Sequence, residues 1–475
     1  MNKNFVCVVL GFFLAQFSLC AMSAPQTLRI DYFHTGSADS EIFSLDQVVL
    51  EPLPFSGNLQ QPIDYTVRGK YLFEVVDPES GEVAWSRSFS SIYGEWETTG
   101  EARKMHRTFH ESLRLPNQEK PFEIVLKKRG EKNRFEEVWR MGIDPNDYMV
   151  HQESAAWADQ VETIQVIAIE GDGGPAHKVD LLILGDGFTA NEHDAFVAKA
   201  RDLTEKLFST SPFKERRSDF NVWAIAPATA ISGVSRPSTN TYRDTPFGAT
   251  YDAFRSERYV LTTDNKSMRR IASSAPYDFV VILTNTDTYG GGGIYGLYAT
   301  AAANSDWADY LFIHEFGHHF AGLADEYYTS SVAYEASETV IEPYEPNVTA
   351  LLDPDHVKWA DLVAADTPLP TPWPKEAYDK HSMAYQEIRT KMREDDVPES
   401  KMNELFRSNQ EIVEGMFSET PHADDIGAFE GANYQSTGFY RSEQNCLMFT
   451  RTTHFCKVCS NAIEQVIDEY TKPGS

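Results

Sequence analysis

The first third of the chain alternates short stretches of apolar and β-branched residues with turn-forming residues. This pattern predicts strands at 27–33, 47–53, 70–76, 83–90, 107–115, 122–126 and 135–141. Turn-favouring segments such as 78–81 and 127–130 separate them. Short strands that follow one another without helices are typical of a sandwich of two sheets. We therefore predict an all-β sandwich over 24–150, an accessory domain that either supports the rest of the chain or binds substrate.

A different pattern begins near residue 160. The apolar run 179–185 predicts a buried strand, 191–208 has helical spacing, and 220–226 and 279–284 predict further buried strands. Strands that alternate with helices indicate an α/β domain, here spanning 160–475. Within it, 329–440 is irregular, Pro-rich and acidic, with helical stretches at 382–393 and 401–417. We expect this segment to be an insertion that flanks a cleft.

Residues 1–23 have the features of a signal peptide. Lys3 supplies a charged start, 5–17 is apolar, and the small residues of 21–23 suit a cleavage site. The mature chain is therefore expected to be secreted or periplasmic, with a lipid anchor at Cys20 or an uncleaved anchor helix as alternatives. No later segment is apolar over the ~20 residues that a span requires, so we expect no membrane span in the mature chain.

The composition narrows the classes of partner. The formal net charge is −29, with 71 acidic and 42 basic residues, which argues against nucleic acid and anionic membranes as partners. Apolar residues make up 41% of the chain and aromatic residues 12%, enough to fill real cores. A chain of 475 residues is longer than a single hydrophobic core usually accommodates, so two or three domains are expected.

The sequence 314–318 reads His-Glu-Phe-Gly-His, the pattern HExxH. Apolar residues at helical spacing precede it in 305–313, which predicts a helix. Residues four apart share one helix face, so His314 and His318 can bind the same zinc ion. Glu315 then lies beside the metal and can act as general base for a water that the metal makes acidic. The alternative is a helix with two packed or solvent-facing histidines.

A catalytic zinc needs a third protein ligand. Gly322 is a plausible helix terminator, and Asp325 follows it with a carboxylate that zinc accepts. This order resembles the metzincin peptidases, although Asp replaces their usual His and one extra residue precedes the glycine. We expect Asp325 to be the third ligand. The competing candidates are His319, Glu326, Glu335 and Glu338.

The glycine-rich segment 289–296 lies shortly before the predicted zinc helix. It is not a phosphate-binding loop, because no Gly-Lys-Ser/Thr follows. Metzincin-like enzymes have an edge strand beside the zinc cleft at this point of the chain. The resemblance therefore implies an edge strand to which an extended substrate adds, and the alternative is a surface loop.

Three of the five cysteines, Cys446, Cys456 and Cys459, lie close together near the C-terminus, and the other two belong to the predicted signal peptide. In an exported protein these three favour a disulfide, Cys446 with Cys456 or Cys459. Reduced packing is one alternative. A second metal site, completed by His454, is another.

Several strings resemble the bacterial IgA-peptidase family of metallopeptidases. They are 185–189, 314–328, 345–347, 368–372, 427–432 with Tyr434, 438–441, 446–448 and 455–459. The resemblance implies a zinc endopeptidase of metzincin-like fold with His314, His318 and Asp325 as ligands of one catalytic Zn²⁺ and Glu315 as base. Met448 is similar in place to the methionine turn that supports a metzincin site. The oxyanion donor stays open among Tyr327, Tyr328 and Tyr440.

The function expected from the sequence is an exported zinc-dependent endopeptidase that acts on protein or peptide substrates. Two alternatives remain: a secreted glycan- or protein-binding module with a residual zinc site, and a zinc hydrolase of non-peptide substrates. Intact His314, Glu315 and His318 favour the enzyme, because decay of a residual site is expected to affect Glu315 first. Only the name of the family points to immunoglobulin A as a substrate.

Overall fold

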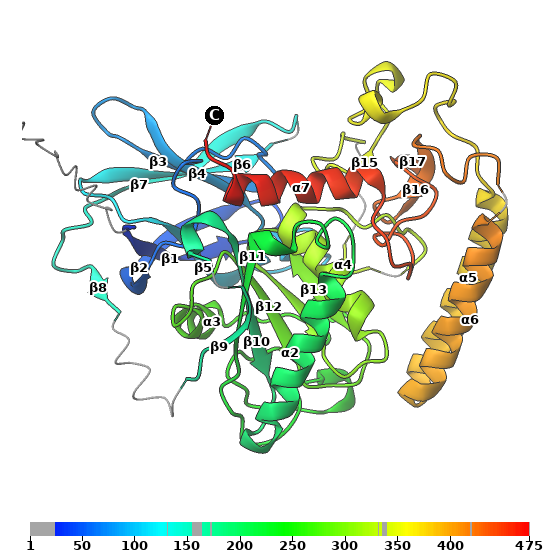
Figure 1. Cartoon of the computed structure of the whole chain (residues 1–475), viewed down its shortest axis with the longest axis horizontal. Helices are drawn as coiled ribbons and strands as arrows, with labels where there is room; N and C mark the ends of the chain where they lie inside the picture. Colours follow the sequence, from blue (N-terminus) through cyan, green and yellow to red (C-terminus); the bar gives the residue numbers. More distant parts are fainter. Residues whose placement is uncertain are drawn as a thin grey trace, which may run out of the picture.

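The computed structural model describes residues 24–130, 132–153, 164–171, 173–330, 332–334, 340–418 and 420–474. The predicted signal peptide 1–23 and two of the alternative zinc ligands, Glu335 and Glu338, lie outside the described residues. An N-terminal layer of strands packs beside a larger α/β part, and a pair of long helices stands on the far side of that part (Figure 1).

The N-terminal region is built from two four-stranded sheets. The first has the order β5 (Arg107–Pro116), β1 (Gln26–Gly36), β2 (Glu41–Pro54) and β8 (His151–Gln152), and the second β4 (Val83–Phe89), β3 (Tyr71–Val76), β6 (Phe122–Arg129) and β7 (Phe135–Ile143). Side chains of both sheets, such as Ile30 and Ile124, meet in one buried core. The strands predicted from the alternating pattern are all present, and the short helix α1 (Ile92–Trp96) follows β4.

A six-stranded mixed sheet forms the centre of the α/β part. Its order is β13 (Gly291–Ile294), β14 (Tyr298–Ala302), β12 (Phe279–Thr284), β10 (Val179–Asp186), β11 (Phe220–Ile225) and β9 (Ile167–Glu170). The four inner strands are parallel to one another, whereas β13 and β9 run antiparallel at the two edges. The strands β10 and β12 are buried throughout, as continuous apolar runs predict.

The two faces of this sheet are covered by different elements. Along β10, Leu181 and Ile183 face a core that also contains residues of α2 (His193–Leu207), α4 (Ala308–Ala321) and α7 (Lys457–Thr471). Leu182 and Leu184 face the opposite core, closed by α3 (Asn265–Ala272), α1 and β5. Successive side chains of a strand point to opposite faces, so one apolar run serves both cores.

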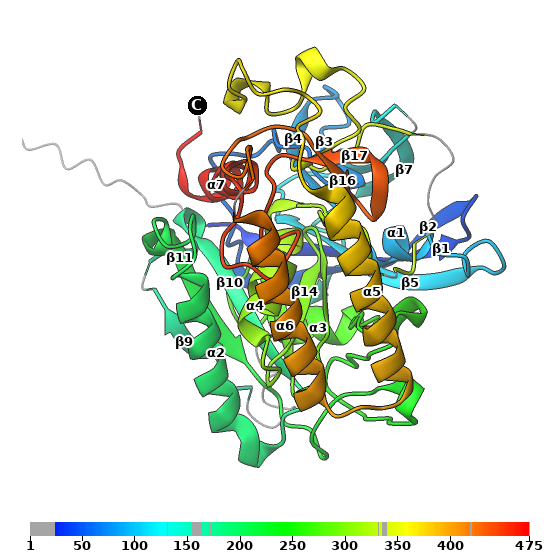
Figure 2. The ribbon, with the colours of Figure 1, turned by 90° about the vertical axis from the view of Figure 1, so that its right-hand side faces the viewer.

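The segment after α4 contains more regular structure than its composition suggests. The helices α5 (Lys375–Glu394) and α6 (Glu399–Phe417) pack side by side as a hairpin (Figure 2). The strands on either side of this hairpin in the sequence form a small sheet, ordered β15 (Val348–Thr349), β17 (Gln435–Arg441) and β16 (Phe429–Ala432). Tyr378, Phe406 and Phe417 anchor the hairpin in the main core. Among the described residues, every helix is too short or too polar to cross a membrane.

Buried polar contacts fix the N-terminal sandwich to the α/β part. The guanidinium of Arg68 is buried and donates hydrogen bonds to the carbonyl oxygens of Ala321 and Ala462, each at 2.9 Å. On another side, Ser56 and Arg114 both donate to the carbonyl oxygen of Tyr277, at 2.7 and 2.8 Å. Arg68 thereby ties the sandwich to the C-terminal end of α4.

Within the glycine run, β13 is an edge strand that lies directly against α4, as the resemblance to metzincin-like enzymes implied, and not a surface loop. A Cβ atom at Gly293 would lie 2.3 Å from the carbonyl oxygen of Glu315 and 2.8 Å from Cβ of His318. Neither the helix backbone nor a Cβ atom can move independently, so only glycine permits this approach. The glycines therefore set the distance between the sheet edge and the helix that carries the HExxH residues.

Gly293→Ala is expected to lower the free energy of unfolding by about 1–3 kcal/mol, because the added methyl overpacks the contact between β13 and α4. Urea unfolding of the full chain measures this change. The matched control is Gly415→Ala on the exposed side of α6, where a Cβ meets nothing within 4 Å; it is expected to stabilise by about 0.5–1 kcal/mol. Equal stability of the Gly293 variant and the parent chain would refute the close-approach argument.

Candidate metal centre

The helix α4 brings His314 and His318 to the wall of a cavity. Its opposite face carries Phe312, Phe316 and Phe320, which are completely buried in the main core and fix the rotation of the helix. The helix ends at Ala321, and Gly322 takes the left-handed conformation with φ of 60°. This terminator, predicted from the sequence, redirects the chain so that Asp325 returns toward the two imidazoles.

Three potential ligand atoms converge at one point. Oδ1 of Asp325 lies 3.0 Å from Nε2 of His314 and 3.1 Å from Nε2 of His318, and the two Nε2 atoms are 3.2 Å apart. A tetrahedral zinc ion with bonds near 2.0–2.1 Å separates its donor atoms by about 3.3 Å. The spacing of these atoms therefore fits a single zinc ion.

The hydrogen bonds of the two Nδ1 atoms determine whether the Nε2 atoms can bind a metal ion. Nδ1 of His314 lies 3.1 Å from the carbonyl oxygen of Leu447, and Nδ1 of His318 lies 2.6 Å from that of Leu323. A carbonyl oxygen only accepts hydrogen bonds, so each Nδ1 carries the proton and each Nε2 of a neutral ring presents a lone pair. Two lone pairs and a carboxylate oxygen that face one another are stabilised by positive charge between them, either a proton on an imidazole or a metal ion.

The electrostatics of the three side chains agree with a site that attracts positive charge. Burial lowers the pKa of His318, but the charge and hydrogen bond of Asp325 outweigh it and raise that pKa to about 9. Burial raises the pKa of Asp325, and the two imidazoles outweigh it and hold the pKa well below its ordinary value. Protons and metal ions therefore compete for the same lone pairs.

Glu315 lies next to this point. One of its carboxylate oxygens is within 4.8 Å of the ligand nitrogens of both His314 and His318. Its side chain lines the cavity. Burial raises the pKa of its carboxyl group above the ordinary value, although the neighbouring His314 and His318 oppose this shift. The carboxylate is therefore placed to accept a proton from a water molecule beside the three converging atoms.

The structure directs two competing ligand candidates elsewhere. His319 is completely buried; its Nδ1 lies 3.0 Å from the carbonyl oxygen of Ile294, and its Nε2 accepts from the amide of Val280 at 3.1 Å. Burial lowers its pKa to about 3, so the ring stays neutral and structural. Glu326 points away from the cavity, toward Cys459.

Tyr434 and Met448 support the centre from distant parts of the chain. The hydroxyl of Tyr434 donates to Oδ2 of Asp325 at 2.5 Å, across 109 residues of sequence. Met448 is completely buried beneath α4, where a Cβ at Gly317 would lie 3.1 Å from its sulfur. The sequence suggested Met448 through its resemblance to a methionine turn. Tyr434 belongs to the strings that resemble the IgA-peptidase family, but the sequence assigned it no role in the site.

The three tyrosines considered as oxyanion donors have different surroundings. Tyr327 lines the cavity, its ring stacks along that of His314, and its hydroxyl accepts from Arg258 at 3.0 Å. The hydroxyl of Tyr328 instead donates to Asp379 at 2.6 Å. Tyr440 lies on β17 and does not line the cavity, although its neighbour Phe439 does. Of these candidates, Tyr327 alone faces the site.

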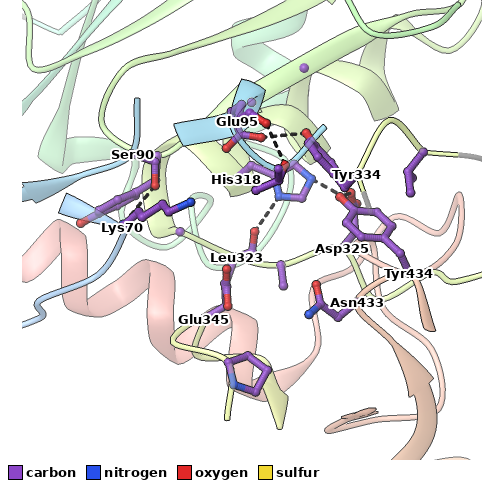
Figure 3. Close-up of a pocket in the computed structure, with 18 of the residues that line it drawn as sticks. Lys70, Ser90, Glu95, His318, Leu323, Asp325, Tyr334, Glu345, Asn433 and Tyr434 are labelled. Atoms are coloured by element: carbon purple, nitrogen blue, oxygen red, sulfur yellow. Dashed lines mark hydrogen bonds and ion pairs between the residues drawn. The ribbon is translucent and has the colours of Figure 1, made fainter. Parts of the chain in front are cut away.

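The cavity has a volume of about 610 Å³ and is walled by separate parts of the chain. The sandwich contributes Lys70, Ser90 and Glu95, and Tyr334 and Tyr434 close the side around Asp325 (Figure 3). Tyr334 donates to Glu95 at 2.7 Å, which joins the sandwich to the segment that follows α4. The N-terminal region therefore shapes the site as well as packing against the α/β part.

The expected disulfide is not present. Cys446, Cys456 and Cys459 are free and buried, and the sulfurs of Cys446 and Cys459 are 3.8 Å apart, far beyond the ~2.05 Å of a disulfide. The expected fourth ligand of a metal alternative, His454, is exposed and contacts Thr452. The three sulfurs instead surround the carboxylate of Glu326.

Comparison with known families decides the broader assignment. The family model for IgA peptidase M64 matches residues 167–467, and the model for the peptidase M64 N-terminus matches residues 19–140. The chain belongs to the IgA peptidase M64 family. This confirms the resemblance drawn from the motifs and the division into an N-terminal domain and a mixed α/β peptidase domain. No curated protein matches the chain.

Membership of the M64 family indicates a peptidase, and hence a hydrolase with a protein substrate. It also suggests a metal cofactor, which agrees with the grouped His314, Glu315 and His318.

Tyr434→Phe is expected to weaken zinc binding by roughly 10–100-fold, because Asp325 loses the hydrogen bond that orients its carboxylate. Competition with a chromogenic chelator measures the dissociation constant. Tyr440→Phe, which removes a hydroxyl outside the cavity, serves as control and is expected to bind zinc like the parent chain. Equal affinity of all three proteins would show that Tyr434 does not support the ligand.

Proposed function

We propose that the chain is an exported zinc-dependent endopeptidase in which His314, His318 and Asp325 hold one zinc ion and Glu315 is the general base. One observation carries the proposal: two imidazole Nε2 atoms and a carboxylate oxygen converge at 3.0–3.2 Å in a cavity of a peptidase-family chain. The export part of the proposal rests on the signal-like pattern of 1–23.

A metzincin-like architecture is part of the same proposal. In its support, the HExxH helix ends at a left-handed glycine, Asp325 follows three residues later, and Met448 packs beneath the helix at Gly317. The mixed sheet also has an antiparallel edge strand, β13, against that helix.

The chemistry divides between the metal and the side chains of the chain. A zinc ion held by His314, His318 and Asp325 would supply Lewis-acid polarisation of a peptide carbonyl and would lower the pKa of water. Glu315 takes the proton from the attacking water and later passes it to the leaving amine. Tyr327, whose lone pair is engaged by Arg258, keeps its own proton available to donate to the developing oxyanion.

The substrate is proposed to bind as an extended peptide along β13. The main chain of Gly291 is engaged by Arg258 and Val260, with both hydrogen bonds at 3.1 Å. Gly291, Gly292 and Gly293 all line the cavity. An extended segment can add to such an edge through main-chain hydrogen bonds. Lys70 and Glu95 of the sandwich place both signs of charge in the same cavity, where substrate side chains would lie.

Glu315→Gln is expected to lower kcat/KM toward peptides by about 10²–10⁴-fold, because the amide cannot accept the proton from water. The zinc content, measured by mass spectrometry of the metal, is expected to stay unchanged. Glu411→Gln on the exposed side of α6 is the matched control for loss of one carboxylate and should retain full activity. Undiminished activity of the Glu315 variant would sink the mechanism.

Removal of the metal by a chelator is expected to abolish cleavage of a peptide library, and addition of zinc should restore it, because the carbonyl is no longer polarised without the ion. Mass spectrometry of the library measures cleavage at internal bonds. Full activity after removal of the metal would contradict zinc dependence. Zinc binding without any cleavage would favour a binding module, and hydrolysis of esters alone would favour a non-peptide hydrolase.

A further inference from the structure

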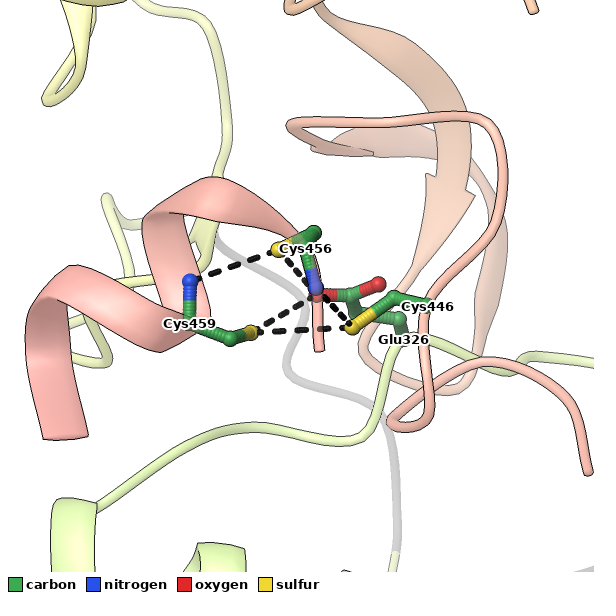
Figure 4. A group of neighbouring side chains, drawn as sticks. All are labelled: Glu326, Cys446, Cys456 and Cys459. Carbon is green, nitrogen blue, oxygen red and sulfur yellow. Dashed lines mark hydrogen bonds between the residues drawn. The ribbon is translucent and has the colours of Figure 1, made fainter. Parts of the chain in front are cut away.

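A second group of potential metal ligands lies outside the cavity. The side chains of Glu326, Cys446, Cys456 and Cys459 are all buried, and one ligand atom from each lies within 4.8 Å of the others (Figure 4). Glu326 follows Asp325 directly, Cys446 comes from the loop before Met448, and the other two come from the beginning of α7. Three segments of the chain thus meet at this group.

The separations within the group fit one tetrahedral ion. Two thiolates bound at about 2.3 Å are about 3.8 Å apart, and a thiolate and a carboxylate oxygen about 3.6 Å apart. The sulfurs of Cys446 and Cys459 are 3.8 Å apart, and Oε1 of Glu326 lies 3.4 Å from Cys459 and 4.0 Å from Cys456. All three observed distances are close to these values.

Backbone amides donate hydrogen bonds to two of the three sulfurs, which favours the thiolate form of those two. The amide of Cys456 donates to the sulfur of Cys446 at 3.2 Å, and the amide of Cys459 donates to the sulfur of Cys456 at 3.3 Å. Cys456 is also the N-cap of α7, where the helix dipole favours negative charge. The spacing Cys-x-x-Cys at 456–459 is typical of structural zinc sites.

The carboxylate of Glu326 provides an independent observation. The side chain has 0% exposure; Oε1 accepts from Asn347 at 2.9 Å, but Oε2 has no hydrogen-bond partner among the described residues. The buried Arg441 gives its hydrogen bonds to main-chain carbonyls such as those of Gln444 and Gly431. A buried carboxylate without a paired cation is costly, and a divalent ion among the sulfurs removes that cost.

We propose that Glu326, Cys446, Cys456 and Cys459 bind a second zinc ion in a closed, structural site. Four protein ligands leave no open position for water or substrate, so the role of the ion is structural and not catalytic. Soft thiolates select zinc over magnesium or calcium. The orienting contact from Asn347 to the carboxylate corresponds to the outer hydrogen bonds that support metal ligands.

The second ion would fix the segments that carry the catalytic ligands. The amide of Glu326 donates to the carbonyl oxygen of Met448 at 2.9 Å, and the carbonyl oxygen of Leu447 is the one that orients His314. Asp325 is joined directly to Glu326. The structural site therefore couples α7 and the loop around Met448 to the ligands of the first site.

The number of zinc ions per chain tests the proposal. We expect two in the full chain, and one each in His318→Ala and Cys459→Ser. Because Cys459→Ser can also affect folding, Glu326→Gln provides a milder test, with zinc bound at least about 10-fold more weakly at one of two sites. Glu430→Gln, a carboxylate on β16 outside the group, should keep both ions. If the catalytic site of the proposed function binds no zinc, the parent chain should hold one zinc ion. Cys459→Ser should then lose this ion, and His318→Ala should keep it.

Cobalt substitution and alkylation identify the ligands. Cobalt in the second site should give the intense sulfur-to-metal charge-transfer absorption, which His318→Ala keeps and Cys459→Ser loses. Alkylation of the denatured chain without reductant should modify Cys446, Cys456 and Cys459. A single zinc ion in the parent chain that Cys459→Ser retains would overturn the proposal. Modification of all three cysteines of the group would then mean that they are packed in the reduced form, and modification of only one would mean a disulfide between the other two.

Discussion

Two imidazole lone pairs and one carboxylate oxygen face one another across 3.0–3.2 Å at the end of α4, and the surrounding structure holds them there. Such an arrangement is unfavourable unless positive charge lies between the three atoms. The carbonyl oxygens of Leu447 and Leu323 fix the tautomers of the two rings, and Tyr434 holds the far oxygen of Asp325. The site therefore depends on segments that are remote from one another in the chain.

Packing of the larger elements sets the position of that helix. The phenylalanines of α4 occupy the main core, and Gly293 lets the edge strand β13 approach the opposite side of the helix. Arg68 of the sandwich engages the carbonyl oxygen of Ala321 in the last turn. The N-terminal domain thus stabilises the same turn from which the chain bends back to Asp325, and it also supplies Lys70 and Glu95 to the cavity.

Local sequence patterns were sufficient to predict the strands of the sandwich, the strand β10 and the HExxH helix with its terminator Gly322. Periodicity and capping depend on residues that are close together in the sequence. The strand β14 was missed, since its small residues carry no strong pattern. The contact of Tyr434 with Asp325 spans 109 residues, and that of Cys459 with Glu326 spans 133. The disulfide expectation failed for this reason: the cysteines were considered without the carboxylate that the fold places among them.

Anomalous diffraction at the zinc edge from crystals of the full chain tests the central claim most directly. The account predicts a peak in the cavity about 2.0–2.2 Å from Nε2 of His314, Nε2 of His318 and an oxygen of Asp325. A zinc-loaded crystal without a peak at that point, in which Asp325 remains hydrogen-bonded to both imidazoles, would contradict it.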